Sequence, residues 1–554
     1  MNTFYSGQYT VLEIFAKAKD GTLGRFLLKD EEGKEIIKQG GQGFFQWNKI
    51  DIQKNVNYIV DFDEVEISIG YLSGIEDILE KGICYIDFSE SVVKLEGEAL
   101  TDFYHTSYKE QYHFVPIKNW NNDPNGLCWY EGRYHLFYQA NPHEQKWGDM
   151  YWGHAVSKDL IHWTHLPYVF QPQQEILEQD QLKGGAFSGC AVPMEDEVIF
   201  YLTRHLGPLE DGPDTMEWQT MSRSKDMIHF EEETIVIKDK PEGVGYDFRD
   251  PKVFCDKGIW YMVLAGAFNG QSAILLYSSP DLLQWEYLGP LVVEPDPGST
   301  TFECPDFFYL DGKYVALGAL MKHTDEHGRY QMTKYYVGDF IDHKIHVEST
   351  GWFDFGSNYY AVQSFEHEGK RIAIGWVSDF YEEHVEVKNG SYGSFALPRV
   401  LSLRNDVLCM EPVPQVYDLK QEIIYQGQGE SIEIDQIPSN SYYVKLDLKH
   451  STDFIMELGR DEDQHIYLLR DHGVTKIKTV NTKTDHIDFI ADVQDVKNIE
   501  VFVDRRVVEV YINHGYAVGT KLFYTPSCEG IFGVKFHEAE NVEYLEIATM
   551  KSIW

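Results

Sequence analysis

Ser157-Lys-Asp-Leu-Ile-His-Trp163 is the first of three copies of one heptad, and the others are Ser224-Lys-Asp-Met-Ile-His-Phe230 and Ser279-Pro-Asp-Leu-Leu-Gln-Trp285. A second pattern, an acidic turn followed by an apolar strand, occurs five times, at residues 131–138, 196–201, 256–263, 311–317 and 368–374. Its register marks are Gly132, Glu197, Gly258, Gly312 and Gly369, which lie 65, 61, 54 and 57 residues apart. Because such a period is typical of propellers and suits a four-stranded blade, the sequence predicts a five-bladed β-propeller.

The first strands of successive blades are expected to line a central channel. Counting nine residues back from each register mark gives Asp123, Ser188, Arg249, Glu303 and Tyr360. Residues in one register converge around the propeller axis although they are far apart in the sequence. We therefore expect a pocket on that axis.

The flanking segments are also rich in strand patterns but lack the repeats, so the fold class is all-β. Residues 1–105 are expected to form an N-terminal β-rich accessory domain, and residues 106–415 the propeller. A linker is predicted at 416–428. Residues 429–554 include the hairpin-like run at 501–515 and predict a C-terminal β-sandwich.

Composition excludes several classes of partner. The chain has 48 Lys and Arg against 89 Asp and Glu, a net charge of −41, which repels nucleic acid and anionic membranes. Its start has no secretory pattern and no stretch is apolar enough to span a bilayer, so a cytoplasmic protein is expected. The 7 scattered cysteines predict free thiols. His135, His154 and His162 lie in strand patterns typical of core or turn residues, and no metal or cofactor is expected.

Three acidic motifs carry the candidate chemistry: Asn122-Asp-Pro-Asn-Gly126, Phe248-Arg-Asp-Pro251 and Phe302-Glu-Cys-Pro-Asp306. The first, taken alone, is equally typical of an ordinary surface turn. Together they place Asp123, Asp250 and Glu303 near equivalent channel positions. Since like charges brought together destabilise a fold, this coincidence favours a functional site.

From about residue 110 to 550 the sequence resembles glycoside hydrolase family 32, the invertase, levanase and inulinase family. Besides the acidic motifs, the resemblance rests on the stretches 113–116, 120–126, 134–142, 152–155, 187–189, 375–376 and 397–399. It extends to 503–513 in the C-terminal segment, where Arg506 replaces a usual Ser. The resemblance implies a five-bladed propeller followed by a β-sandwich, and hydrolysis with retention of configuration.

The resemblance also implies roles for individual residues. Asp123 looks like the nucleophile that forms a covalent fructosyl intermediate, and Glu303 like the general acid and base. Asp250 looks like the acid that holds fructose hydroxyls. Implied substrate-binding residues are Trp120, Asn121, Asn122, Gln139, Trp147, Phe187, Ser188, Arg249, Cys304, Tyr360 and Trp376. Asn121, Phe302 and Phe380 depart from the residues usual in the family, which puts the leaving-group side in question.

The sequence therefore predicts a β-fructofuranosidase that acts on a small carbohydrate, sucrose or a short fructo-oligosaccharide. Three alternatives stay open: a fructosyltransferase using the same intermediate, an arabinan-type propeller glycosidase, and a non-catalytic carbohydrate-binding propeller. The leaving group is also open among sucrose, its 6-phosphate, and β-2,1 or β-2,6 fructo-oligosaccharides. The N-terminal domain could narrow the pocket mouth, bind oligosaccharide or mediate a homo-oligomer.

Overall fold

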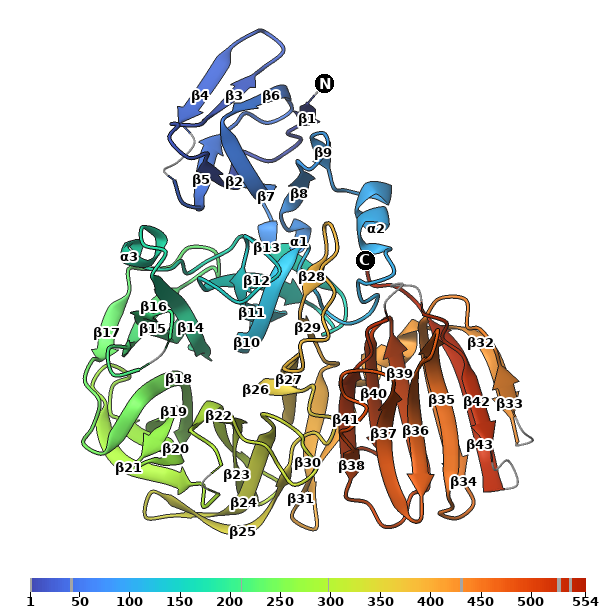
Figure 1. Ribbon diagram of the computed structural model, residues 1–554. Coiled ribbons are helices and arrows are strands. Elements are labelled where there is room, and N and C mark those ends of the chain that lie inside the picture. The colour runs from blue at the N-terminus through green and yellow to red at the C-terminus, as the bar shows by residue number, and fades with distance from the viewer. Residues whose placement is uncertain are drawn as a thin grey trace.

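The computed structural model describes residues 2–39, 43–210, 212–296, 298–428, 432–525, 530–537 and 541–554. Nearly all of the regular structure is antiparallel β-sheet (Figure 1). The short helices are α1 (Ile78–Lys81), α2 (Glu98–Tyr104), α3 (Gln174–Leu177) and the 3-10 helix η1 (Pro414–Leu419). None of the helices in the described ranges is long and apolar enough to cross a membrane.

Five sheets surround a common centre in Figure 1 and form the blades of the propeller. Blade 1 contains β10 (Asn119–Tyr130), β11 (Arg133–Asn141), β12 (Tyr151–Ser157) and β13 (Trp163–Leu166). Blade 2 contains β14 (Leu182–Pro193), β15 (Val198–Pro208), β16 (Met216–Ser224) and β17 (Thr234–Ile237). Blade 3 contains β18 (Val244–Asp256), β19 (Ile259–Phe268), β20 (Gln271–Ser279) and β21 (Glu286–Val293).

Blade 4 contains β22 (Thr301–Leu310), β23 (Lys313–Met321), β24 (Thr333–Ile341) and β25 (Lys344–Trp352). Blade 5 contains β26 (Tyr360–His367), β27 (Lys370–Val377), β29 (Ser394–Phe395), β30 (Arg399–Arg404) and β31 (Val407–Pro412). A further short strand, β28 (Ser391–Tyr392), pairs in parallel with β10 and so joins the end of the propeller to its first blade.

The heptad repeat forms the turn between the third and fourth strands of blades 1 to 3. In blade 1 the Ser157 hydroxyl accepts the backbone N–H of Leu160 at 2.8 Å, and the Asp159 carboxylate accepts the N–H of Ile161 at 2.9 Å. Leu160 has φ 70° and is buried. The short polar side chains therefore satisfy the backbone of a strained turn, while its apolar residue anchors the turn in the core.

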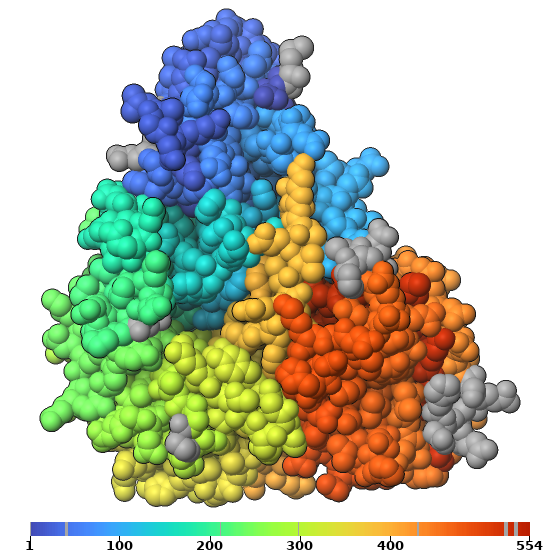
Figure 2. Space-filling model, viewed as in Figure 1, coloured from blue at the N-terminus to red at the C-terminus, as the bar shows by residue number. Residues whose placement is uncertain are grey.

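Two flanking units complete the fold. The N-terminal unit has one sheet of β1 (Thr3–Tyr5), β6 (Asn57–Asp63), β3 (Arg25–Lys29) and β4 (Glu35–Gln39). Its second sheet has β5 (Gln46–Asp51), β2 (Val11–Ala18), β7 (Val65–Ser73), β8 (Cys84–Asp87) and β9 (Val93–Lys94). Figure 2 shows this unit in blue, seated against the first blades.

The C-terminal unit consists of two six-stranded sheets packed around an apolar core. One sheet contains β32 (Lys420–Gly427), β43 (Val542–Met550), β34 (Ser441–Leu448), β39 (Asn498–Asp504), β40 (Val507–Ile512) and β41 (Ala517–Leu522). The other contains β33 (Ile432–Ile434), β42 (Val534–His537), β35 (Phe454–Asp461), β36 (Gln464–Asp471), β37 (Val474–Val480) and β38 (Phe489–Ala491). The predicted fold class, a five-bladed propeller followed by a β-sandwich with an additional N-terminal β domain, is confirmed.

The structure differs from the expected linker at 416–428, because η1 and β32 occupy it and β32 pairs with β43 in the sandwich. The division at residues 105 and 415 stays a prediction.

A buried cluster of charges joins the propeller to the sandwich. His113, Asp354 and Arg399 come from the propeller, and Asp504 and Glu509 from the sandwich; we call these five residues the seam cluster. The His113 ring contacts Asp504 and Glu509, each at 2.9 Å. Arg399 donates to Asp354 at 2.9 Å and to Glu509 at 2.7 Å. Each cation is paired with carboxylates from more than one segment, which fixes how the two units meet.

Candidate active site

The innermost strand of every blade contains a β-bulge at the same level. At each bulge the innermost strand advances three residues while its neighbour advances two. The bulges lie between Asn121 and Pro124, Ala186 and Gly189, Arg249 and Lys252, Glu303 and Asp306, and Tyr360 and Gln363. Asp250, Cys304 and Ala361 have positive φ values of 58°, 45° and 52°. Bulges re-aim side chains and are common next to active sites, so this distortion turns polar groups toward the propeller axis.

The five residues counted back from the register marks lie at two different positions relative to these bulges. Arg249, Glu303 and Tyr360 are the last paired residues before their bulges, whereas Asp123 and Ser188 lie inside theirs. The count of nine residues from the turn therefore holds to within two residues. The offset arises because the lengths of chain between bulge and turn differ among the blades.

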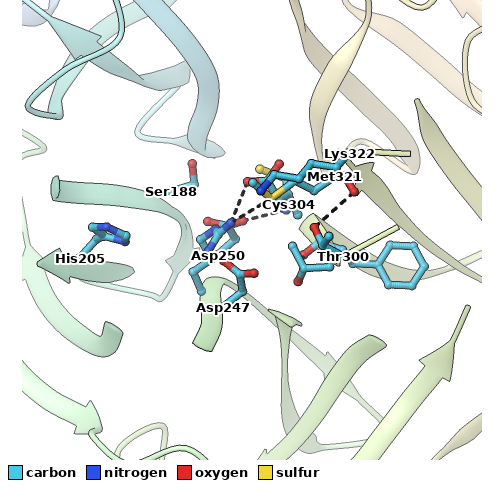
Figure 3. Close-up of polar contacts among 12 residues, drawn as sticks. Ser188, His205, Asp247, Asp250, Thr300, Cys304, Met321 and Lys322 are labelled. Carbon is cyan, nitrogen blue, oxygen red and sulfur yellow. Dashed lines mark hydrogen bonds and ion pairs between the residues drawn. The ribbon is translucent and has the colours of Figure 1, made fainter. Parts of the chain in front are cut away.

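A pocket of about 340 Å³ lies among the bulges. Predicted site residues on its wall are Trp120, Asn122, Asp123, Gln139, Trp147, Phe187, Arg249, Asp250, Glu303, Tyr360 and Trp376. The other three, Asn121, Ser188 and Cys304, are buried behind that wall. Figure 3 shows Ser188, Asp250 and Cys304, from three different blades, around one centre.

Asp123 receives hydrogen bonds from three neighbours. Ser188 Oγ and Cys304 Sγ donate to Oδ2 at 2.5 and 3.3 Å, and Asn122 Nδ2 donates to Oδ1 at 3.0 Å. Burial raises the pKa of Asp123, and the charge of Glu303 adds to that rise, while the bonds from Ser188, Asn122 and Cys304 oppose it. The donors thus favour the ionised form that a nucleophile needs, although the pocket as a whole disfavours it.

A chain of hydrogen bonds behind Asp123 fixes these donors. Trp120 Nε1 donates to Asn122 at 2.7 Å, Asn122 donates to Gln139 at 2.9 Å, and Gln139 Nε2 donates to Ser188 at 2.9 Å. These side chains therefore orient one another as well as the carboxylate. Such a network holds a reacting group in place before the substrate arrives.

Glu303 is held at both carboxylate oxygens. Arg249 Nη2 contacts Oε1 at 3.0 Å, and the Tyr360 hydroxyl donates to Oε2 at 2.5 Å. Burial and the charge of Glu303 raise the pKa of Tyr360 well above its ordinary value, so the phenol stays a donor. Arg249 is itself shared with Asp247 and Glu217. The guanidinium is therefore shared among Glu303, Asp247 and Glu217.

Asp250 lines the same pocket but has fewer hydrogen bonds than Asp123 to stabilise its ionised form. Its Oδ2 accepts the backbone N–H of Cys304 at 2.9 Å. Burial raises the pKa of Asp250 to about 8, with Asp123 and Glu303 adding to the rise and Arg249 opposing it. At neutral pH this carboxyl holds a proton more readily than an ordinary Asp, because three acids share one small cavity.

Several pocket residues were missed by the sequence argument: Lys183, His205, Met321, Gln331 and Asp379. Most lie outside the bulges, on neighbouring strands or in loops, where no repeat marks them. Phe380, noted only as a departure from the family, contacts Tyr360 and Trp376 edge-on, with ring centroids 4.9 and 5.5 Å away. It closes the aromatic side of the pocket.

That the protein binds no metal ion and no cofactor stays a prediction. In the described ranges, the residues grouped closely enough to hold a metal ion are Asp453, Asp471 and His472, all exposed on the sandwich. Exposed acidic groups of this kind are common without an ion, and the group shares no residue with the pocket.

Two family models match most of the chain from residue 113 onward. The model for the glycosyl hydrolases family 32 N-terminal domain matches residues 113–412, and the model for the C-terminal domain of that family matches 420–551. The sucrose-6-phosphate hydrolase of Escherichia coli is 31% identical over 444 residues, which cover 76% of this chain and 90% of that protein.

Two solved structures are informative. A glycoside hydrolase family 32 structure from Bifidobacterium adolescentis superposes with a TM-score of 0.94 and 31% identity, and covers 100% of this chain and 99% of that one. A mutant Bombyx mori β-fructofuranosidase in complex with sucrose has a TM-score of 0.68 and 26% identity, and covers 82% of this chain and 96% of that one.

Proposed function

The chain belongs to glycosyl hydrolase family 32 and is a glycoside hydrolase that releases fructose; from this premise we propose that Asp123 is its nucleophile and Glu303 its general acid and base. The observation that carries the proposal is that Asp123, Asp250 and Glu303 all line one pocket, although they lie on three different blades. The bulges that turn them inward support the assignment, since they recur at this level in every blade.

In the first half-reaction, a carboxylate oxygen of Asp123 attacks the anomeric carbon of the fructosyl unit. The bond from that carbon to the leaving oxygen breaks as Glu303 transfers its proton to that oxygen. The product is a covalent fructosyl ester on Asp123. Ser188, Asn122 and Cys304 hold the attacking carboxylate in position through their hydrogen bonds.

In the second half-reaction, Glu303 accepts a proton from a water molecule, whose oxygen attacks the same carbon and releases Asp123. Two displacements at one carbon retain its configuration. Asp250 is proposed to hold fructose hydroxyls, more tightly as the ring flattens toward an oxocarbenium ion. Trp376, Tyr360 and Phe380 form the apolar side of the fructose site.

Two substitutions test the roles of the acids. Glu303→Gln should lower kcat for sucrose by about 10³-fold or more, because proton transfer to the leaving group is lost. A fructofuranoside whose leaving group needs no protonation should recover the first half-reaction, seen as a burst of released leaving group. Asp123→Asn should abolish turnover of both substrates. A folded Glu303→Gln variant that shows no burst would contradict the acid role.

A cytoplasmic location is also proposed. The six cysteines in the described ranges are free thiols, and five of them are buried; Cys528 lies outside those ranges. Free buried thiols suit a reducing compartment.

A further inference from the structure

A second cavity adjoins the active-site pocket and is partly walled by the N-terminal domain. It has a volume of about 570 Å³ and shares Trp147 and Lys183 with the pocket; we call it the outer groove. Its wall from the N-terminal domain consists of Phe15, Lys17, Gly43, Phe44 and Phe45. The shared residues make the two cavities neighbours along one continuous surface, and each falls in the size range of ligand sites.

The N-terminal wall is firmly attached to blade 1. Ser68 Oγ donates to the carbonyl of Pro142 at 2.7 Å, and the Phe45 ring lies tilted against His143 with centroids 3.8 Å apart. Phe15 packs edge-on against Tyr151 at 5.4 Å. Phe15, Phe45 and Tyr151 belong to a larger apolar cluster between the two units. The wall therefore has a defined position relative to the catalytic acids, as a binding subsite requires.

The groove offers the chemistry of a carbohydrate site. Trp147, at the junction, is 39% exposed, a large fraction for a tryptophan. Phe44 is half-buried and lies outside the apolar cores of the described residues. Aromatic faces suit the apolar faces of sugar rings, and carboxylates accept hydrogen bonds from hydroxyl groups.

The charges of the groove favour a neutral ligand over a phosphorylated one. Glu144, Asp149 and Asp180 line it together with Lys17 and Lys183. Both lysines lie over aromatic rings, Lys17 over Phe45 at 5.0 Å and Lys183 over Trp147 at 5.2 Å. Three carboxylates against two ammonium groups repel an added dianion.

We propose that the N-terminal domain forms subsites for the leaving group, so that the enzyme prefers neutral fructo-oligosaccharides of three or more sugar units to sucrose. This inference rests on the proposed function, since the acids must cleave the bond at the inner end of the groove. A trisaccharide or longer substrate places its additional units beyond the disaccharide, along Trp147 toward Phe44.

Phe44→Ala in the full-length chain tests the inference, with Tyr5→Ala as the matched control. Tyr5 is an exposed aromatic residue of the same domain, 47% exposed, and is not part of the groove. Phe44→Ala should lower kcat/KM for 1-kestose and its tetrasaccharide homologue by about fivefold, the value of one aromatic contact, and leave sucrose within about twofold. Tyr5→Ala should change none of these values.

The outcomes distinguish a failure of the proposed function from a failure of the inference about the outer groove. If the wild-type protein released no fructose from any of these sugars, the proposed function would fail. If it released fructose but Phe44→Ala changed sucrose and 1-kestose equally, or neither, only the inference would be overturned. A preference for sucrose 6-phosphate that is lost in Lys183→Ala would also overturn it, because the groove would then select phosphate.

Discussion

Two buried clusters of charge, the seam cluster and the pocket among the bulges, differ in the pKa values of their carboxylates. In the seam, burial alone would raise the pKa of Glu509, but Arg399 and His113 lower it to about 2, and His113 likewise lowers the pKa of Asp504. Asp354 is the exception there, since burial raises its pKa despite Arg399. In the pocket, burial and mutual repulsion raise the pKa of Asp123, and that of Asp250 to about 8.

The difference teaches that burial alone does not decide the pKa of an acid, because charged partners can reverse its effect, as they do at Glu509 and Asp504. The seam places a cation between carboxylates from different segments, so its charges are largely compensated. In the pocket, Arg249 contacts Glu303 among the three acids and also pairs with Asp247 and Glu217. Uncompensated charge destabilises a fold and is typical of a functional site, whereas compensated charge is typical of a structural one.

The largest expected effect on stability follows from removing Arg399 from the seam cluster. Arg399→Met leaves Asp354 and Glu509 buried without their guanidinium, and should lower the free energy of unfolding by about 3–5 kcal/mol. Denaturant unfolding measures it. Lys388→Met is the control, because its pair with Glu90 is exposed and should contribute nothing measurable. If Arg399→Met and Lys388→Met were equally stable, the proposed stabilisation by the seam cluster would be contradicted.

The seam also predicts a dependence of stability on pH. Burial would lower the pKa of His113, but Asp504 and Glu509 raise it to about 9. The folded state therefore binds its proton more tightly than the unfolded state. The stabilisation, roughly 3 kcal/mol, should be complete below about pH 6.5 and lost as pH rises through 9. The unfolding free energy of the wild type minus that of His113→Gln should shrink accordingly; a constant difference would contradict it.

The pocket predicts a change in stability of the opposite sign. Asp250→Asn removes a carboxylate whose pKa is raised on folding, so it should stabilise the protein near pH 8. The gain should vanish as pH falls toward 4. Fructose release should nevertheless fall by about 10²-fold, because contacts to the sugar are lost. The matched change in the seam, Asp504→Asn, should destabilise; stabilisation there would contradict the comparison.

The sequence predicted the propeller well because its signals are local. The turn at 131–132, where Glu131 and Gly132 both have positive φ, joins two strands that are adjacent in the chain. The same holds for the Ser and Asp that satisfy the backbone of the heptad turn. Asp123 and Glu303 were found for a related reason, since each lies nine residues before the register mark of such a turn, and Asp250 is next to the equivalent position.

Other parts of the site had no local signal. His205 and Lys183 enter the pocket from outside the expected register. The stretch 397–399 and the stretch 503–513 were recognised only as motifs, and their purpose appears where Glu509 accepts the Leu397 N–H and the Arg399 guanidinium. No property of either stretch alone indicates that they meet.

The sequence by itself determined the number of blades, because repeated turns and strands depend on neighbours a few residues away, and its family motifs indicated the sandwich and the three acids. Tertiary structure alone decided which buried charges are compensated, where the bulges aim them, and that Phe44 lies beside a groove shared with Trp147. The physical reason is that electrostatic and packing energies depend on distance in space. Residues separated by a hundred or more positions supply them.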